Sequence, residues 1–186
     1  MALDFKQTSR GGRPIAAFFI LAAILQVAVA PQLSILGGRI NFMLAMTVAL
    51  AVGGDSRMMT YVGFGAGLFY DLTSSVPVGL MALLLTLLGY VVSSMSRGIT
   101  PGMSMDTLRL VGIGVLLVNI IYGLCLFFMG VETNLLMAIG VHGLTSSVLT
   151  GIVSIPFLLF GTGGGSSRGF SAAGRRSQGS RYKSLH

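Results

Sequence analysis

Few side chains in this sequence carry the chemistry of a catalytic or ligand-binding group, and most of them stand alone. His142 has no Ser, Asp or Glu at a spacing that would form a catalytic set with it. Cys125 is the only cysteine among the 186 residues, so the sequence offers no internal disulfide and no thiolate cluster for a metal ion. We therefore predict that the protein is not an enzyme, and we expect no catalytic residue, metal site or cofactor.

Asp71 is the most informative acidic residue, because it directly follows the apolar run 61–70. A carboxylate in the middle of a bilayer costs roughly 2.5 to 3.5 kcal/mol on insertion scales, so it needs a partner, a cavity or a shallow position. Two interpretations stay open. Either Asp71 lies in the outer interface and caps the short turn 72–79, or it belongs to an outward-facing polar pocket.

Three further polar residues are expected on the same side of the membrane as Asp71. Arg39 and Asn41 flank the start of one apolar stretch, and Thr73 lies in the turn that follows Asp71. An ion pair between Arg39 and Asp71 would explain a basic residue on that side. The candidate outward polar pocket or partner-binding site therefore consists of Arg39, Asn41, Asp71 and Thr73.

The composition places these residues in an integral membrane protein. Hydrophobic residues make up 53% of the chain and charged residues only 9%, and the mean hydropathy is +0.86. A soluble domain of this size does not show that balance. The net charge of +7 comes without aromatic residues interleaved in a basic patch, so we expect anionic lipid, and not nucleic acid, as the partner of the basic residues.

Six apolar stretches are candidates for transmembrane helices: residues 14–36, 40–52, 58–76, 78–95, 108–129 and 135–160. A helix that crosses the hydrocarbon layer of roughly 30 Å needs about 20 residues, and the stretch 40–52 is clearly shorter. The basic residues before the first stretch resemble those of a secretory signal. Because further apolar stretches follow at once, we interpret the first one as a retained anchor.

The basic residues test this count, because Lys and Arg near span ends concentrate on the cytoplasmic side. With six crossings and a cytoplasmic N-terminus, only Arg39 of the 12 basic residues falls outside. The basic residues that fall inside are Lys6, Arg10, Arg13, Arg57, Arg97, Arg109, Arg168, Arg175, Arg176, Arg181 and Lys183. Five crossings would place the two terminal clusters on opposite faces, so we keep the short second span.

The chain thus divides into a basic cytoplasmic N-terminus (1–13), a six-helix transmembrane domain (14–160) and a basic cytoplasmic tail (161–186). The tail is rich in Gly, Ser and Arg and has too little apolar surface to offset the entropy of ordering, so we expect it to be disordered. Gly63 and Gly67 are four residues apart in the third stretch, the spacing that lets two membrane helices approach closely.

The sequence around these glycines resembles a known family. It reads Gly-Phe-Gly-Ala-Gly-Leu-Phe-Tyr-Asp-Leu, then a short polar turn, then Val-Gly-Leu-Met-Ala-Leu-Leu-Leu-Thr-Leu-Leu-Gly-Tyr. This resembles the rod shape-determining protein MreD family, in which a Gly-rich third helix ends in Gly-Leu-x-x-Asp-Leu and a Gly-Leu start and a Gly-Tyr mark the next helix. The matching residues are Gly67, Leu68, Asp71, Leu72, Gly79, Leu80, Gly89 and Tyr90.

The resemblance implies a non-catalytic subunit of the bacterial cell-elongation complex in the plasma membrane. It implies binding to MreC, coupling of MreB filaments to peptidoglycan synthesis, and contact with other members such as RodA; a homodimer is a further expected assembly. It adds Gly79, Gly89 and Tyr90 to the expected helix-packing residues. The MreD family also resembles the substrate-binding subunits of energy-coupling-factor transporters in fold, so a vitamin-binding subunit with an outward pocket is the alternative.

Overall fold

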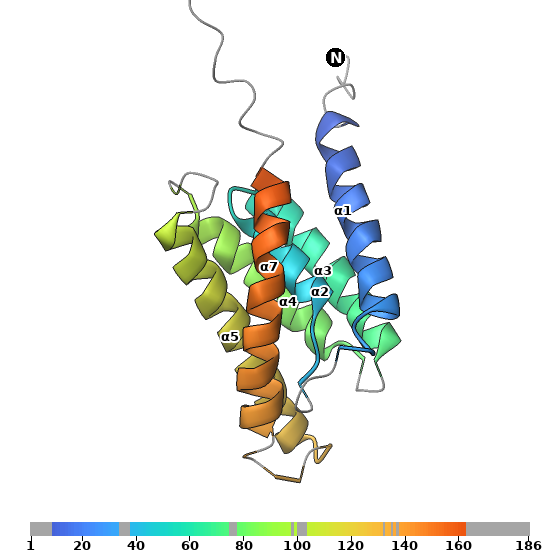
Figure 1. Ribbon diagram of the computed structural model, residues 1–186. Helices are drawn as coiled ribbons and strands as arrows, with labels where there is room; N and C mark the ends of the chain where they lie inside the picture. Colours follow the sequence, from blue (N-terminus) through green and yellow to red (C-terminus); the bar gives the residue numbers. More distant parts are fainter. Residues whose placement is uncertain are drawn as a thin grey trace, which may run out of the picture.

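The computed structural model describes residues 9–33, 38–74, 78–97, 99, 104–131, 133, 134, 136 and 138–162. Their regular structure is helical, and no β-strand occurs among these residues. In chain order the helices are α1 (Ser9–Ala28), α2 (Phe42–Ala51), α3 (Ser56–Thr73), α4 (Leu80–Met95), α5 (Met105–Phe128), the π-helix η1 (Ala138–Thr145) and α7 (Ser146–Thr162). They pack as one bundle (Figure 1), which confirms the predicted all-α class.

Each apolar stretch that was expected to form a helix contains one, although the ends differ. α1 begins at Ser9, ahead of the expected start at residue 14. Among the described helices, Met105–Phe128 and Gly143–Phe160 are long and apolar enough to cross a membrane, judged by length and composition. That the chain crosses the membrane six times stays a prediction. Residues 1–8 and 163–186, which include nearly all of the tail expected to be disordered, lie outside the described residues.

The first helix, α1, begins at the same end of the bundle at which the last helix, α7, ends. Figure 1 shows the beginning of α1 and the end of α7 together at the top, while α1 ends and η1 begins lower in the molecule. An even number of crossings requires this arrangement. It is the geometry on which the predicted placement of both termini in the cytoplasm depends.

The short helix α2 lies in the centre of the bundle. Nine of its 10 residues are buried, and it packs against α1, α3, α4, α5 and α7. A helix of this length spans about 15 Å, only half of the hydrocarbon thickness. Because its neighbours surround it, α2 can be apolar on every face and does not need to reach both membrane surfaces.

The extended segment that leads into α2 has its backbone held by side chains from other helices. The N–H of Asn41 donates to Thr150 Oγ1 on α7 at 3.2 Å, and that of Phe42 donates to Gln26 Oε1 on α1 at 2.9 Å. Asn41 itself caps α2, since its Oδ1 accepts from the N–H of Leu44 at 2.9 Å. At membrane depth, non-helical backbone is tolerated only where protein groups or a water-filled cavity satisfy it. Gln26 and Thr150 therefore make this extended segment compatible with a bilayer.

Helices α3 and α4 form a tight hairpin through glycines. A Cβ atom at Gly63 would overlap the carbonyl oxygen of Leu85, and one at Gly67 would overlap the backbone of Ala82. A Cβ atom at Gly89 would lie 2.5 Å from the carbonyl oxygen of Met59. The missing side chains let the two backbones touch, as small residues do at membrane helix interfaces.

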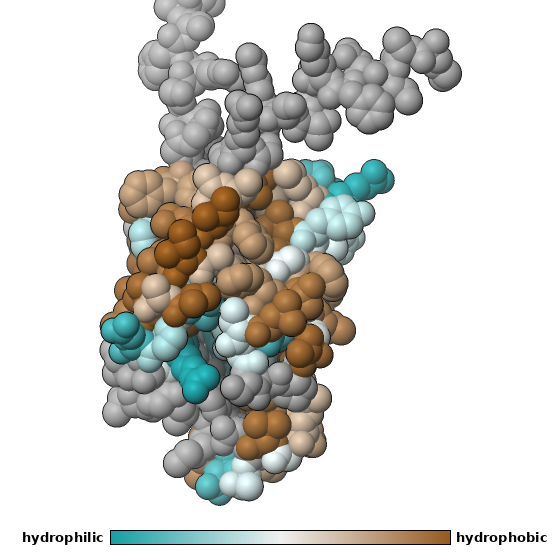
Figure 2. Space-filling model, turned by 90° about the vertical axis from the view of Figure 1, so that its right-hand side faces the viewer, coloured by the Kyte–Doolittle hydropathy of each residue, from teal (hydrophilic) through white to brown (hydrophobic). Residues whose placement is uncertain are grey.

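The outer surface of the bundle is apolar on several sides. Figure 2 looks at the molecule from the side of α1 and shows apolar side chains over much of that face. Exposed large apolar residues on the helices include Ile20, Leu21, Ile24, Val27, Phe64, Leu72, Leu83, Leu87, Ile113, Leu117, Ile121, Val148, Ile152, Leu159 and Phe160. Soluble monomers rarely expose contiguous apolar surface on this scale, so the surface fits contact with lipid.

Candidate functional site

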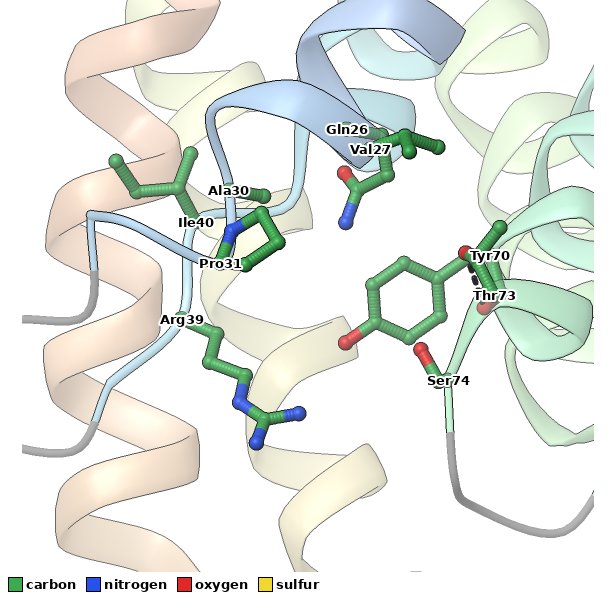
Figure 3. A pocket seen from close by; sticks show the side chains of 9 residues that line it. All are labelled: Gln26, Val27, Ala30, Pro31, Arg39, Ile40, Tyr70, Thr73 and Ser74. Carbon is green, nitrogen blue, oxygen red and sulfur yellow. Dashed lines mark hydrogen bonds between the residues drawn. The ribbon is translucent and has the colours of Figure 1, made fainter.

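A cavity of about 470 Å³ with a mixed polar and apolar lining opens at the end of the bundle where α1 ends and α2 begins (Figure 3). Three segments supply its wall: the end of α1 with the residues that follow, the extended segment before α2, and the end of α3. Its lining residues are Gln26, Val27, Ala30, Pro31, Arg39, Ile40, Tyr70, Thr73 and Ser74. The tertiary fold therefore gathers polar groups here that are far apart in the sequence.

Arg39 is the charged residue of this wall. Its backbone N–H donates to Ser146 Oγ on α7 at 3.1 Å. This hydrogen bond holds the backbone of Arg39 beside α7. Figure 3 shows the guanidinium group and the hydroxyls of Tyr70 and Ser74 facing a common space. Within the described part of the chain the guanidinium has no ion pair and no hydrogen-bond acceptor. Arg39 thus brings a positive charge to the cavity wall.

Tyr70 and Thr73 complete the polar side of the cavity from α3. Tyr70 is only 7% exposed, and its ring packs edge-on against Tyr122 of α5 with centroids 6.2 Å apart. Thr73 Oγ1 donates to the carbonyl oxygens of Phe69 and Tyr70, each at 3.0 Å. Both side chains are therefore held by α3 and its neighbours before any ligand arrives.

Asp71 does not face this cavity but caps α4. It is 1% exposed, and its Oδ2 accepts from the N–H groups of Gly79 at 2.9 Å and Ala82 at 3.0 Å. Its Oδ1 accepts from the N–H of Met81 at 3.2 Å. The first N–H groups of a helix lack partners within the helix, and an anion near them is also favoured by the helix dipole. The carboxylate of Asp71, at the end of α3, thus caps the N-terminus of α4.

The ion pair between Arg39 and Asp71 that would explain a basic residue on this side is not formed. No salt bridge joins these two described residues, because the Asp71 carboxylate is directed to the start of α4. Of the four residues expected to form an outward pocket, Arg39 and Thr73 line the cavity, whereas Asn41 and Asp71 cap helices α2 and α4. Nδ2 of Asn41 is buried and lacks a hydrogen-bond partner among the described groups.

Gln26, Tyr70 and Ser74 are site residues that reasoning from the sequence did not place in the pocket. Gln26 is a single polar residue within the first apolar stretch, and Tyr70 is part of the apolar run 61–70. A helical period starting from Thr73 could have found Tyr70, because residues three apart share a helix face. The sequence carries no comparable signal for Gln26, which reaches the site only through the packing of α1 on α2.

The resemblance added Gly79, Gly89 and Tyr90 to the expected helix-packing residues, and the structure gives each of them a different role. Gly79 precedes α4 with φ of +108°, and a Cβ atom there would meet nothing within 4 Å. Its role is therefore conformational, since a left-handed backbone favours glycine. Tyr90 is 53% exposed and lines an apolar groove on the outer side of α3 and α4. Of the added residues, Gly89 is the one at the contact between the two helices.

The remaining polar groups do not assemble a reactive centre among the described residues. No group of three or more His, Cys, Asp and Glu side chains lies together in that part of the chain. Cys125 is half-buried in α5. His142 belongs to η1, but its side chain lies outside the described residues. The arrangement that can act chemically is the cavity at Arg39, which offers a cation and hydroxyl groups to a ligand.

Comparison of this chain with protein-family models, curated proteins and solved structures gave no match.

Proposed function

We propose that this protein is a non-catalytic, multi-pass subunit of the bacterial plasma membrane that belongs to the cell-elongation complex. In this role it binds MreC and helps to couple cytoplasmic MreB filaments to peptidoglycan synthesis outside, together with proteins such as RodA. Both termini lie in the cytoplasm, where the basic residues face anionic lipid. The proposal starts from the resemblance of residues 63–90 to the MreD family.

The observation that carries this proposal is the joint role of the residues behind that resemblance. Gly67 and Gly89 permit the backbone contact of α3 and α4, and Asp71 caps the second of these helices. Gly79 supplies the left-handed turn before α4. Gly67, Asp71, Gly79 and Gly89 of the family pattern thus act together in one hairpin, which supports a shared design of α3 and α4.

The exposed surface supports the membrane part of the proposal. Apolar side chains cover the outward faces of α1, α4, α5 and α7. The two termini of the bundle are at one end, which agrees with the one-sided distribution of basic residues. A chain with this surface has its stable environment in lipid.

Co-purification tests the scaffold function. Tagged protein extracted from its host in a mild detergent is expected to bring down MreC, a membrane protein with a periplasmic coiled coil. Asp71→Ala is expected to lower the yield of MreC, because the start of α4 loses its cap. Asp106→Ala is the matched control, since that carboxylate belongs to an exposed pair with Arg109 in which both side chains are 76% exposed. Absence of MreC from the wild-type preparation would contradict the proposal.

A vitamin-binding subunit of an energy-coupling-factor type transporter is the second candidate, and the cavity favours it. Its volume of about 470 Å³ falls in the range of small-molecule sites, which is roughly 300 to 1,000 Å³. The same purification separates the two functions. Recovery of a pair of ATPases, or of a vitamin retained by the protein, would support the transporter and not the elongation complex.

A further inference from the structure

We infer that the cavity at Arg39 binds a phosphate group, presented by a membrane lipid or by a small soluble phosphate ester. This inference goes beyond the scaffold function and does not require MreC. It shares with that function only the orientation that places the cavity at the outer membrane surface. The reasons lie in the charge, the hydroxyl groups and the position of the cavity.

The charge of the cavity wall favours an anion. Among the described residues that line the cavity, Arg39 is the only charged one, and none of the described carboxylates forms an ion pair with its guanidinium. The carboxylate of Asp71, on the same helix as Tyr70 and Thr73, has both oxygens occupied by N–H groups of Gly79, Met81 and Ala82. Its negative charge is therefore directed to the helix terminus of α4 and not to Arg39.

The polar groups around Arg39 suit a phosphate. Guanidinium presents N–H donors in a planar fork that matches phosphate oxygens. Figure 3 shows the hydroxyls of Tyr70 and Ser74 facing the same space. The two side chains share a hydrogen bond, and because a hydroxyl can accept one hydrogen bond while it donates another, the pair still has a proton to donate to a phosphate oxygen. The N–H groups at the start of α2 are not part of this site, because Gln26 and Asn41 already accept from those of Phe42 and Leu44.

The position of the cavity favours a lipid as the source of the phosphate. Val27 forms part of the cavity wall and is also 57% exposed on the outside of α1. Ile24 and Ile20, exposed at 59% and 60%, lie on the same outer face of α1, further along the helix from the cavity. A lipid could place its headgroup at Arg39 and lay an acyl chain along Val27, Ile24 and Ile20.

Two probes distinguish the sources. Phosphatidylglycerol, added to protein in a neutral detergent, is followed by native mass spectrometry against phosphatidylcholine. Glycerol 3-phosphate is followed by isothermal titration calorimetry on the same preparation. Saturable binding of either probe that depends on Arg39 supports the inference, and the probe that binds identifies the source.

The variants are chosen to separate binding from folding. Arg39→Ala is expected to weaken binding about tenfold, because it removes a charge-assisted hydrogen bond. Arg39→Lys is expected to lose less, since the charge stays and the planar fork is lost. Arg109→Ala is the matched control, because Arg109 is exposed near the start of α5 and pairs with Asp106 at 3.9 Å. Circular dichroism and gel filtration establish that each variant is folded.

The inference is overturned if neither probe binds, or if Arg39→Ala and Arg109→Ala bind as the wild type does. Neither result would affect the co-purification of MreC. Conversely, a preparation without MreC that still binds phosphatidylglycerol through Arg39 would reject the scaffold function and keep the site.

Discussion

At the scale of single residues, Asp71 shows how a buried carboxylate can be stable without a basic partner. Three backbone N–H groups of the turn and of α4 bind its two oxygens at distances from 2.9 to 3.2 Å. Hydrogen bonds to a charged acceptor are stronger than those between neutral groups. The capping interpretation of Asp71 therefore accounts for its burial, and Arg39 is not needed to neutralise it.

Replacing Asp71 tests this role. Asp71→Ala leaves the buried N–H groups of Met81 and Ala82, and the less buried one of Gly79, without their acceptor. We therefore expect a loss of about 2 kcal/mol or more in the free energy of unfolding. Asp71→Asn keeps one acceptor oxygen and should lose less. Thermal unfolding in a mild detergent, followed by circular dichroism, measures both. A midpoint for Asp71→Ala equal to that of Asp106→Ala would show that the cap does not stabilise the fold.

At the scale of helices, the hairpin of α3 and α4 and the buried α2 determine where the cavity forms. The glycines of the hairpin bring α3 against α4, and the turn after Thr73 returns the chain beside Asp71. α2 fills the centre of the bundle, so the extended segment before it reaches the cavity and places Arg39 there. A longer second helix would have replaced this segment with regular helix.

A glycine substitution in the hairpin tests the close contact of the helices. Gly67→Ala is expected to destabilise the protein by about 3 kcal/mol or more, because the new methyl group overlaps the backbone of Ala82 and the helices must separate. Gly112→Ala is the matched control on α5, where a Cβ atom meets nothing within 4 Å. It should change stability by about 1 kcal/mol or less. Equal unfolding midpoints of the two variants would contradict this account.

At the scale of the whole molecule, the apolar outer surface and the common end of the first and last helices predict its placement in the membrane. The turn at Asp55 lies between α2 and α3, and Thr133 lies between α5 and η1. The six-span topology assigns these two positions to opposite faces, with Asp55 in the cytoplasm.

Labelling of intact cells with a membrane-impermeant maleimide checks this topology. With Cys125→Ser as background, Thr133→Cys should react from outside, because it is exposed in the loop after α5. Asp55→Cys, also exposed, should react only after the cells are opened. Labelling of both positions in intact cells, or of Asp55→Cys alone, would reject the six-span arrangement and the cytoplasmic termini with it.

The sequence alone determined the helices, since long apolar runs separated by Gly, Pro and charged residues favour little else. It also predicted the Gly63 and Gly67 contact, because residues four apart share one face of a helix. Arg39 and Thr73 were expected to lie on the same side of the membrane, in one candidate pocket. These predictions depend on local spacing or on the one-sided distribution of charge, and both can be read along the chain.

Only the tertiary structure decided which groups meet. Asp71 binds N–H groups 8 to 11 residues further on, and whether they reach it depends on how the turn closes. Gln26 and Thr150 meet the backbone before α2 from helices at the two ends of the chain. Such contacts depend on how whole helices pack against one another. Sequences with the same apolar pattern can pack their helices in different ways. For that reason the chemistry of the cavity became visible only in the folded bundle.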